Sequence, residues 1–267
     1  MIKKNLIYFS VGINSVYAEM TKLSINSIDD SNSEFLDILV ITDKKFYEDN
    51  FKFFDRPNFY IHIVDDIKNP DEVCFNKTRI FDFENINDYE NILYLDSDIL
   101  INYNLNYLFK KCKKDSKLYS VVEDYSIENH RRIQFGFENY SQEDIDFFRN
   151  KKIYTFNCGM FLFKNSYLMR KNFNEVRNLI NNHQGNFFSD QSFMNYYFNT
   201  RNLVDTKKIK KDVDCVFVVE ENINYINDFN QKIYHFLGGT YFGDNKFKIM
   251  KDFKTKLINN DNIQRSF

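Results

Sequence analysis

The sequence predicts an α/β protein with a mostly parallel central sheet. Short apolar runs recur along the first half of the chain, each run ends in polar residues, and helical patterns lie between them. Strands that alternate with helices are typical of parallel sheets with crossover helices. The 267 residues are enough for one large α/β domain, and no linker rich in Pro, Gly or Ser divides them. We therefore expect a single domain over residues 1–267.

The first half of the chain contains the clearest strand patterns. A helical pattern begins at Ser15, between the first two apolar runs. The four runs cover residues 6–11, 35–41, 60–64 and 92–95. Ligands of parallel sheets bind at the carboxyl ends of the strands, so the polar residues after each run are the first candidates for a site.

The second half of the chain is less regular. We expect short strands over residues 118–122, 160–163, 213–219 and 233–236. Helical patterns cover residues 165–180, 190–198 and 247–258.

Charge and cysteine usage exclude several classes of protein. The 36 basic and 38 acidic residues are spread along the chain and give a formal charge of −2, so nucleic acid is not an expected partner. The four cysteines include no Cys-x-x-Cys pair, which argues against a disulfide framework and a zinc site. We recognise no signal peptide and no apolar stretch long enough for a transmembrane helix, and we therefore expect a cytoplasmic protein.

The strongest local signal is Asp96-Ser97-Asp98, directly after the fourth apolar run. Two carboxylates two residues apart can reach one hard divalent cation once the backbone turns. Oxygen ligands suit Mg²⁺ or Mn²⁺, and an imidazole among them favours Mn²⁺. A polar turn or helix cap would explain the triplet equally simply.

A second signal lies near the C-terminus, where His235 stands in a short apolar run that leads to Gly238 and Gly239. Glycines let the backbone approach an anion and offer N–H groups to phosphate oxygens. His235 could complete a metal site, or it could be a core histidine before a tight turn.

Two further segments carry polar groups next to expected elements. Asn157 and Gly159 lie at the entry to a strand, and an Asn amide can bond sugar hydroxyls as donor and as acceptor. Asp190 and Gln191 open a helix after Ser189, either as cap residues or as groups that face the same cleft as the metal.

Taken together and in this order, these segments resemble glycosyltransferase family eight, the retaining GT-A group that contains glycogenin and bacterial lipopolysaccharide galactosyltransferases. The likeness extends over residues 7–243 and is closest to glycogenin-like members. Residues 92–98 resemble the family's strand with its Asp-x-Asp motif, and residues 156–160 resemble its Phe-Asn-Ser-Gly segment. Asp190-Gln191 resembles its Asp-Gln helix, and residues 235–238 resemble its His-x-x-Gly motif.

The resemblance implies a Rossmann-like GT-A domain and a set of site residues. It implies a metal held by Asp96, Asp98 and His235, with Asp190 and Gln191 as the catalytic residues beside the sugar. The nucleotide-sugar contacts that it implies are Ser10, Val11, Gly12, Asn14, Tyr17, Arg79, Ser97, Asn157, Gly159, Gly238 and Lys246.

The implied activity is the transfer of glucose or galactose from a UDP-sugar with retention, dependent on Mn²⁺ or Mg²⁺. The acceptor would be a glycan, a protein or a lipid-linked sugar, bound by loops within residues 123–150. Self-glucosylation on a tyrosine and a homodimer are also compatible with the glycogenin likeness.

Two departures from the family pattern keep alternatives open. Tyr241 stands where the family has a lysine that touches the diphosphate, so Lys246 and Lys248 are the nearest substitutes. Phe187 stands where glycogenin-like members often have an additional Asp. A catalytically weak UDP-sugar-binding module is the main alternative. A nucleotidyltransferase would need a Gly-rich basic loop, which residues 10–16 lack.

Overall fold

The central sheet is mostly parallel, as the sequence predicts. A computed structural model describes residues 4–34, 36–126, 141–182, 189–217, 231–238 and 243–264. The strand order is β10-β6-β9-β4-β1-β2-β3, and β9 is antiparallel to its neighbours β4 and β6. The strands are β1 (Lys4–Ser10), β2 (Leu36–Asp43), β3 (Phe59–Val64), β4 (Tyr89–Leu95), β6 (Leu118–Tyr119), β9 (Met160–Lys164) and β10 (Val204–Asp205).

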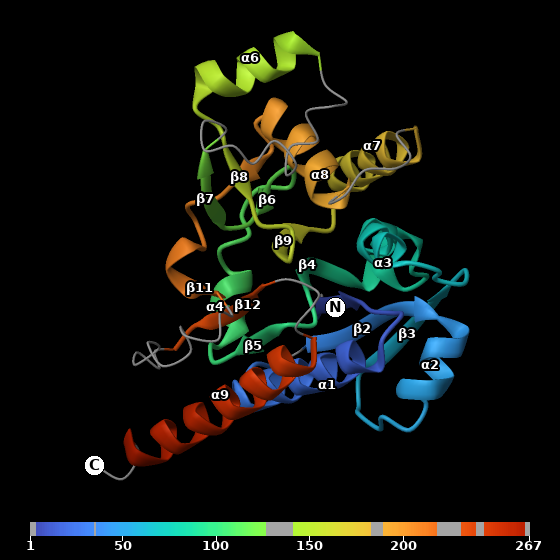
Figure 1. The fold of residues 1–267 in the computed structure, drawn as a ribbon, viewed down its shortest axis with the longest axis vertical. Coiled ribbons are helices and arrows are strands. Elements are labelled where there is room, and N and C mark those ends of the chain that lie inside the picture. Colours follow the sequence, from blue (N-terminus) through green and yellow to red (C-terminus); the bar gives the residue numbers. More distant parts are fainter. Residues whose placement is uncertain are drawn as a thin grey trace.

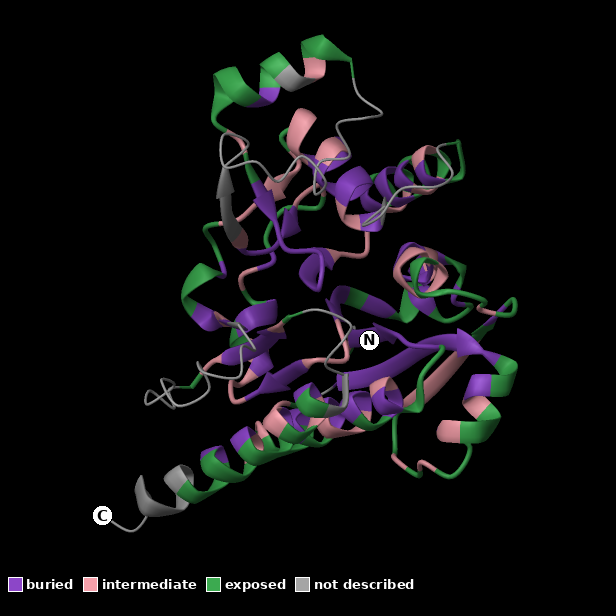
Figure 2. Ribbon diagram, viewed as in Figure 1, coloured by how far each residue is buried: buried purple, intermediate pink, exposed green. Residues whose placement is uncertain are grey.

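Helices cover both faces of this sheet (Figure 1). Successive side chains of β1 point to opposite faces, so Ile7 packs in a core cluster with α1 (Ser15–Asp30), while Tyr8 packs in the cluster that contains α7 and α8 residues. The second face is covered by α7 (Tyr167–Asn182) and α8 (Ser189–Thr200). A sheet buried on both sides needs continuous apolar strands, which explains the apolar runs in the sequence (Figure 2).

A smaller sheet connects the end of the chain to the end of β4. It consists of β11 (Val213–Phe217), β12 (Ile233–Leu237) and β5 (Ile99–Ile101). The antiparallel register of β12 with β5 sets His235 opposite Ile99, one residue after Asp98. This pairing brings the two motifs together although they are far apart in sequence.

The remaining elements surround these sheets. Between β2 and β4 lie α2 (Lys44–Asn50), α3 (Pro70–Asn76) and the 3₁₀ segments η1 (Lys77–Asp82) and η2 (Ile86–Asp88). Later elements are α4 (Leu105–Phe109), the paired strands β7 (Val122–Ser126) and β8 (Tyr154–Phe156), and η5 (Lys210–Asp212).

Two expectations about elements need correction, and a third is tested only over part of its length. The segment 123–150 is not simply loop, because β7 covers its start and α6 (Gln142–Lys151) covers its end. The closing helix α9 (Gly243–Gln264) extends beyond both ends of the predicted one, packed along α1 (Figure 1). Strand β11 ends at Phe217, and residues 218–219 of the predicted strand lie outside the described residues.

Two absences apply to the part of the chain that the structure describes. None of its helices is both long enough and apolar enough to cross a membrane. All four cysteines are free thiols there, which agrees with the absence of a disulfide pattern in the sequence.

Candidate active site

The site is built at the carboxyl end of β4, where Asp96-Ser97-Asp98 leaves the central sheet. The backbone N–H of Asp96 donates to the carbonyl oxygen of Gly159 at 2.7 Å. The N–H of Phe236 donates to the carbonyl oxygen of Asp98 at 2.9 Å. The triplet is therefore fixed on one side by the turn before β9 and on the other by β12, and the partly exposed Ser97 lies between the two aspartates.

Asp96, Asp98 and His235 converge on one point. One ligand atom from each of the three lies within 4.8 Å of the others. Nε2 of His235 is 3.2 Å from Oδ1 of Asp98, and the histidine is only 3 % exposed. Nε2 is therefore the imidazole nitrogen that faces the aspartates, and Oδ1 of Asp98 has no hydrogen-bond partner of good geometry besides this contact among the described residues. Two carboxylates and an imidazole are a ligand set that fits Mn²⁺ or Mg²⁺.

Gly159 lets these three side chains approach one another. A Cβ atom at this position would lie 2.5 Å from Oδ2 of Asp96 and 2.9 Å from Nε2 of His235, so no other residue fits without displacing them. The turn is held by Asn157, whose Oδ1 accepts from the N–H of Gly159 at 2.8 Å. Asn195 on α8 fixes the strand before it, because its amide accepts from Phe156 N at 2.8 Å and donates to Phe156 O at 3.0 Å.

The charges around Asp98 favour its ionised form. Burial opposes ionisation, but the ammonium of Lys246 and the imidazole of His235 hold the pKa of Asp98 well below its usual range. Burial also opposes a charge on His235, yet Asp98 and Asp96 raise the pKa of His235 above its ordinary value. The metal-free site therefore retains a proton on the imidazole to higher pH than an exposed histidine would.

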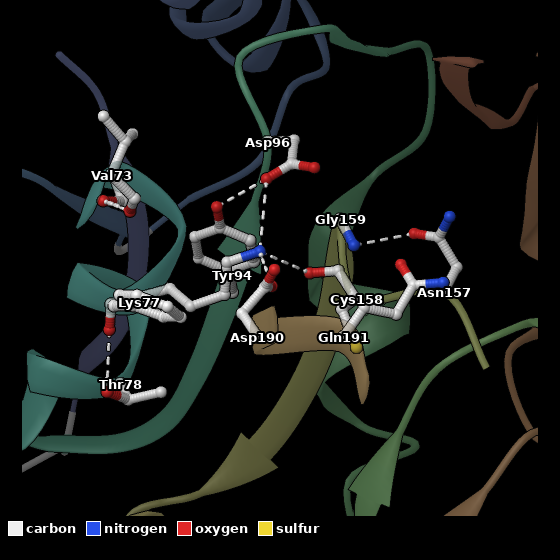
Figure 3. A network of polar contacts seen from close by, with 12 residues as sticks. Val73, Lys77, Thr78, Tyr94, Asp96, Asn157, Cys158, Gly159, Asp190 and Gln191 are labelled. Carbon is white, nitrogen blue, oxygen red and sulfur yellow. Dashed lines mark hydrogen bonds and ion pairs between the residues drawn. The ribbon is translucent and has the colours of Figure 1, made fainter. Parts of the chain in front are cut away.

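A second charged cluster shares Asp96 with the first, and Figure 3 shows Lys77 between Asp96 and Asp190. Lys77, at the start of η1, is 3 % exposed, and its Nζ lies 2.8 Å from Oδ2 of Asp190 and 3.8 Å from Oδ1 of Asp96. The same ammonium donates to the carbonyl oxygen of Cys158 at 3.2 Å and lies 4.7 Å from the ring centroid of Tyr94. Tyr94 in turn donates its hydroxyl to Oδ1 of Asp96, which links the two clusters.

Lys77 and Asp190 stabilise each other's charge in this buried setting. Burial alone disfavours the ammonium, but Asp190, Tyr94 and Asp96 raise the pKa of Lys77 well above its ordinary value. For Asp190, burial outweighs the attraction of Lys77 and raises the pKa of the carboxyl. Gln191 follows Asp190 on α8, and the backbone carbonyl oxygen of Gln191 accepts a hydrogen bond from Nδ2 of Asn195 at 3.0 Å.

Lys246 reaches the site from the first turns of α9. Its Nζ donates to Oδ2 of Asp98 at 2.7 Å and to the carbonyl oxygen of Gly238 at 3.0 Å. Lys248, the other basic residue nearby, is exposed. Gly238 has a φ of 148°, a conformation that favours glycine. Of the two lysines that the sequence offers, the structure brings only Lys246 to the cluster.

The loop after β1 ends at the same edge of the sheet, and two of its polar side chains hold its shape. Ser10 donates its hydroxyl to the carbonyl oxygen of Val73. Asn14 caps α1, because its side chain accepts from the N–H of Val16 at 3.0 Å. Both side chains are therefore engaged with the protein's own backbone.

The remaining residues of this loop pack closely. Gly12 has little room, since a Cβ there would lie 3.0 Å from the Ile67 side chain. Val11 is buried, and Tyr17 follows in the first turn of α1. Burial raises the pKa of the Tyr17 hydroxyl, and the ammonium of Lys246 opposes this effect.

Arg79 is the predicted site residue that the structure does not bring to the aspartates. Its Nε lies 3.2 Å from Oδ2 of Asp82, and Nη1 lies 3.7 Å from Oδ2 of Asp65. A 3₁₀ helix has about three residues per turn, so residues two apart face different directions. Lys77, which sequence reasoning passed over, therefore points inward where Arg79 points to the surface.

Two positions that depart from the expected motifs, Phe187 and Tyr241, lie outside the described residues, as does Gly239.

Comparison with known proteins agrees with this geometry. Residues 8–241 match the family described as glycosyl transferase family 8. No curated protein matches the chain in sequence.

Solved structures share the fold at low identity. The bifunctional glycosyltransferase WbbM has a TM-score of 0.60 and 15 % identity, covering 94 % of this chain and 50 % of that chain, so this chain spans half the length of WbbM. The galactosyltransferase LgtC, solved with donor and acceptor sugar analogues, has a TM-score of 0.54 and 12 % identity over 93 % of this chain and 95 % of that chain. The glycosyltransferase GlyE of Streptococcus pneumoniae TIGR4 has a TM-score of 0.54 and 14 % identity over 95 % of this chain and 64 % of that chain.

The family match covers most of the chain, and the neighbours share its GT-A fold with a mostly parallel central sheet. The chain therefore belongs to glycosyl transferase family 8 and is a glycosyltransferase with a GT-A fold.

Proposed function

We propose that this glycosyltransferase moves a hexose, glucose or galactose, from a UDP-sugar to an acceptor with retention of the anomeric configuration. The observation that carries the proposal is the convergence of Asp96, Asp98 and His235 within 4.8 Å of one another. Such a set would hold Mn²⁺ or Mg²⁺, and a bound ion of this kind neutralises charge that develops on a departing diphosphate.

Lys246 and Gly238 are the proposed contacts of the diphosphate. The ammonium of Lys246 already lies 2.7 Å from Oδ2 of Asp98, so it is close enough to serve both a metal ligand and a phosphate oxygen beside it. Gly238 has no side chain to keep an anion away from the backbone. In this proposal Lys246 supplies the positive charge beside the diphosphate, because the uncharged Tyr241 stands where the family has a lysine. Fixed positive groups aimed at a leaving group accelerate its departure.

The uridine is proposed to lie on the loop after β1. Val11 and Gly12 would present backbone groups to the base, Ser10 and Asn14 fix the loop, and Tyr17 would pack on the uracil ring. This loop and the aspartates share one edge of the sheet because β1 and β4 are adjacent parallel strands.

Asp190, Gln191 and Asn157 are proposed to hold the sugar. In the transfer, the bond from the anomeric carbon to the diphosphate oxygen breaks and a bond to the acceptor oxygen forms. The acceptor proton leaves with the phosphate product. Lys77 holds the Asp190 carboxylate at 2.8 Å, which makes that carboxylate a weak nucleophile. The ion pair therefore favours attack from the face that the diphosphate leaves.

Calorimetric titration with UDP tests the donor site. We expect UDP to bind in the presence of Mn²⁺ and binding to be lost in EDTA. Tight UDP binding without any metal would contradict the site. A donor panel then tests the sugar nucleotide, with UDP-glucose or UDP-galactose expected to be turned over, and turnover of GDP- or CMP-sugars alone would overturn the assignment.

Self-glucosylation is the finer proposal that follows from the glycogenin likeness. We expect the intact mass to increase in steps of one hexose after incubation with UDP-glucose and Mn²⁺. An unchanged mass, under conditions in which UDP-glucose is hydrolysed, would restrict the acceptor to another molecule.

A further inference from the structure

A cavity separate from the aspartate site lies in the lobe formed by α6, β7, β8 and the end of α8 (Figure 1). Its volume is about 720 Å³. The lining comes from several elements that are distant in sequence, from Val122 on β7 to Lys210 in η5. Such a volume is in the range that binds small ligands.

Three lysines make this cavity positively charged. Lys151 ends α6, Lys207 follows β10, and Lys210 begins η5. Among the described residues, no carboxylate lines the cavity, and no salt bridge engages any of the three ammonium groups. The chain as a whole has a formal charge of −2, so this local excess of positive charge is not a property of the average surface.

The uncharged part of the lining suits a sugar. The rings of Phe147 and Tyr154 line the cavity and are 37 % and 47 % exposed, so their faces are accessible to a ligand. Aromatic faces pack against the C–H faces of sugar rings. Asn199 also lines the cavity, and its Oδ1 can accept a hydrogen bond from a sugar hydroxyl, while its Nδ2 donates to the carbonyl oxygen of Tyr154 and to Oδ1 of Asn195. The hydroxyl of Thr200 donates to the carbonyl oxygen of Tyr196, so it belongs to the wall of the cavity.

Strand β8 connects this cavity to the aspartate site. Tyr154 is its first residue and lines the cavity, while Gly159, just after its end, packs against His235 and Asp96. Five residues of extended chain span at most about 18 Å. An oligosaccharide of a few residues covers that distance, so one acceptor chain can occupy both places.

We propose that this cavity binds an anionic saccharide, namely the carboxylated or phosphorylated part of the acceptor glycan away from the reacting hydroxyl. The lysines bind the anionic groups, and the rings of Tyr154 and Phe147 stack on a sugar ring. The amide oxygen of Asn199 accepts a hydrogen bond from a sugar hydroxyl. The acceptor role rests on the proposed transfer reaction, whereas the binding of an anionic saccharide does not depend on it.

Two α-1,4-linked trisaccharides, trigalacturonate and maltotriose, test the binding. They are titrated into the full chain in EDTA at about 0.15 M salt, where charges farther apart than about 8 Å are largely screened. We expect trigalacturonate to bind more tightly than maltotriose. Neutralising the cavity with the triple variant Lys151→Gln, Lys207→Gln and Lys210→Gln should weaken trigalacturonate binding by about tenfold or more, because charge-assisted hydrogen bonds are lost.

A matched control separates a built site from general surface charge. The triple variant Lys44→Gln, Lys251→Gln and Lys256→Gln removes three exposed lysines elsewhere and should bind trigalacturonate like the wild type. Tyr154→Ala should weaken both trisaccharides several-fold, since stacking does not depend on charge. Equal losses in the two triple variants, or no trigalacturonate binding to the wild type, would overturn the proposal.

The outcomes also separate this cavity from the donor site. If UDP binds with Mn²⁺ but trigalacturonate does not bind, the cavity proposal is wrong. The transferase proposal is unaffected by that result. Where both bind, the cavity triple variant should raise the KM for an acidic acceptor and leave donor hydrolysis unchanged. An unchanged KM would contradict the acceptor role.

Discussion

Asp98, whose side chain is 15 % exposed, and the buried Asp190 are two carboxylates at the same edge of the sheet, and each is paired with a lysine. Their pKa values move in opposite directions. Asp98 faces both Lys246 and His235, and these positive groups overcome its burial. For Asp190, Lys77 and a backbone hydrogen bond from Gln191 favour the ionised form, but Lys77 also faces Asp96, and burial prevails. The difference assigns the two acids different tasks. In the proposed reaction Asp98 would stay ionised and bind the cation, whereas Asp190 is held in a buried pair with Lys77 and would position the sugar.

The largest effect is expected when a metal ligand is removed. Asp98→Asn should reduce transfer by about 10³-fold or more, because an amide cannot replace the charge that holds the ion. Calorimetry measures the loss of Mn²⁺ binding, and a UDP-sugar turnover assay measures the loss of transfer. Asp214→Asn, a change of the same kind on the neighbouring strand β11, is the control and should leave both unchanged. Equal activity of Asp98→Asn and the wild type would contradict the need for a metal held by Asp98.

The second cluster is tested through stability. Lys77→Met leaves the buried Asp190 carboxylate without its cation and should cost about 3 kcal/mol of unfolding free energy. The cost should be greater at pH 8 than at pH 5, because protonation relieves the uncompensated charge of Asp190, whose pKa is already raised. Chemical denaturation at both pH values measures this difference.

A double variant completes the test of this ion pair. Adding Asp190→Asn to Lys77→Met should restore part of the lost stability and abolish the pH dependence of the loss, since neither member of the pair then carries a buried charge. Strictly additive losses would show that the two side chains do not interact, and they would then have no common positioning role.

Lys77 also shows what sequence alone could not supply. The segment 77–79 offers two basic residues, and only the three-residue turn of η1 determines which one faces inward. Lys246 is different, because Lys246, Met250, Phe253 and Leu257 follow the spacing of one helix face, and all four are buried. That periodicity is visible in the amino-acid sequence itself, and it favours Lys246 over Lys248 as the lysine that faces inward.

The strands of the central sheet were easier to predict than the lobe formed by α6, β7, β8 and the end of α8. Strands β1, β2 and β4 are buried on both faces, so their sequences are continuous apolar runs that stand out. Helix α6 is mostly exposed and has a weak apolar pattern, and its one clear signal is the capping box from Ser141 to Asp144. The convergence of Asp98 and His235 depends on the pairing of β5 with β12, which no local pattern reveals.

A smaller effect is expected from the turn that supports the metal ligands. Gly159→Ala places a Cβ atom 2.5 Å from Oδ2 of Asp96, so a metal ligand must move and Mn²⁺ affinity should fall by about tenfold or more. Gly12→Ala is the matched change at the other tight glycine and should leave Mn²⁺ affinity unaltered. Wild-type Mn²⁺ affinity in Gly159→Ala would show that the ligands do not depend on this close approach.

Mn²⁺ affinity should also depend on pH. The pKa of His235 is raised above 6.5 in the metal-free protein, so its pairing with Asp98 stabilises the fold at low pH and is lost as the pH rises through the folded value. Metal binding requires the neutral imidazole, so Mn²⁺ binding should tighten between pH 6 and pH 8, by up to about tenfold per unit. Titrations at several pH values measure this slope.

Histidine variants identify the group that releases a proton when Mn²⁺ binds. His62→Gln, at the half-buried histidine of β3, should keep the pH dependence of Mn²⁺ binding. His235→Gln should bind more weakly and lose most of the slope. A slope that survives in His235→Gln would assign the proton to another group.

The smallest effect is expected from the diphosphate contact. Lys246→Gln should weaken UDP binding in the presence of Mn²⁺ by about tenfold, the loss typical of one charged hydrogen bond. Lys248→Gln, two residues along the same helix and exposed, should bind UDP like the wild type. Equal effects of the two changes would mean that Lys246 acts only by general charge.

The most direct test of the metal site is the anomalous diffraction of manganese in crystals soaked with UDP and Mn²⁺. The arrangement of Asp96, Asp98 and His235 predicts one strong peak bound by all three side chains and by the diphosphate. A peak held by other residues, or UDP bound with no manganese beside these side chains, would contradict it.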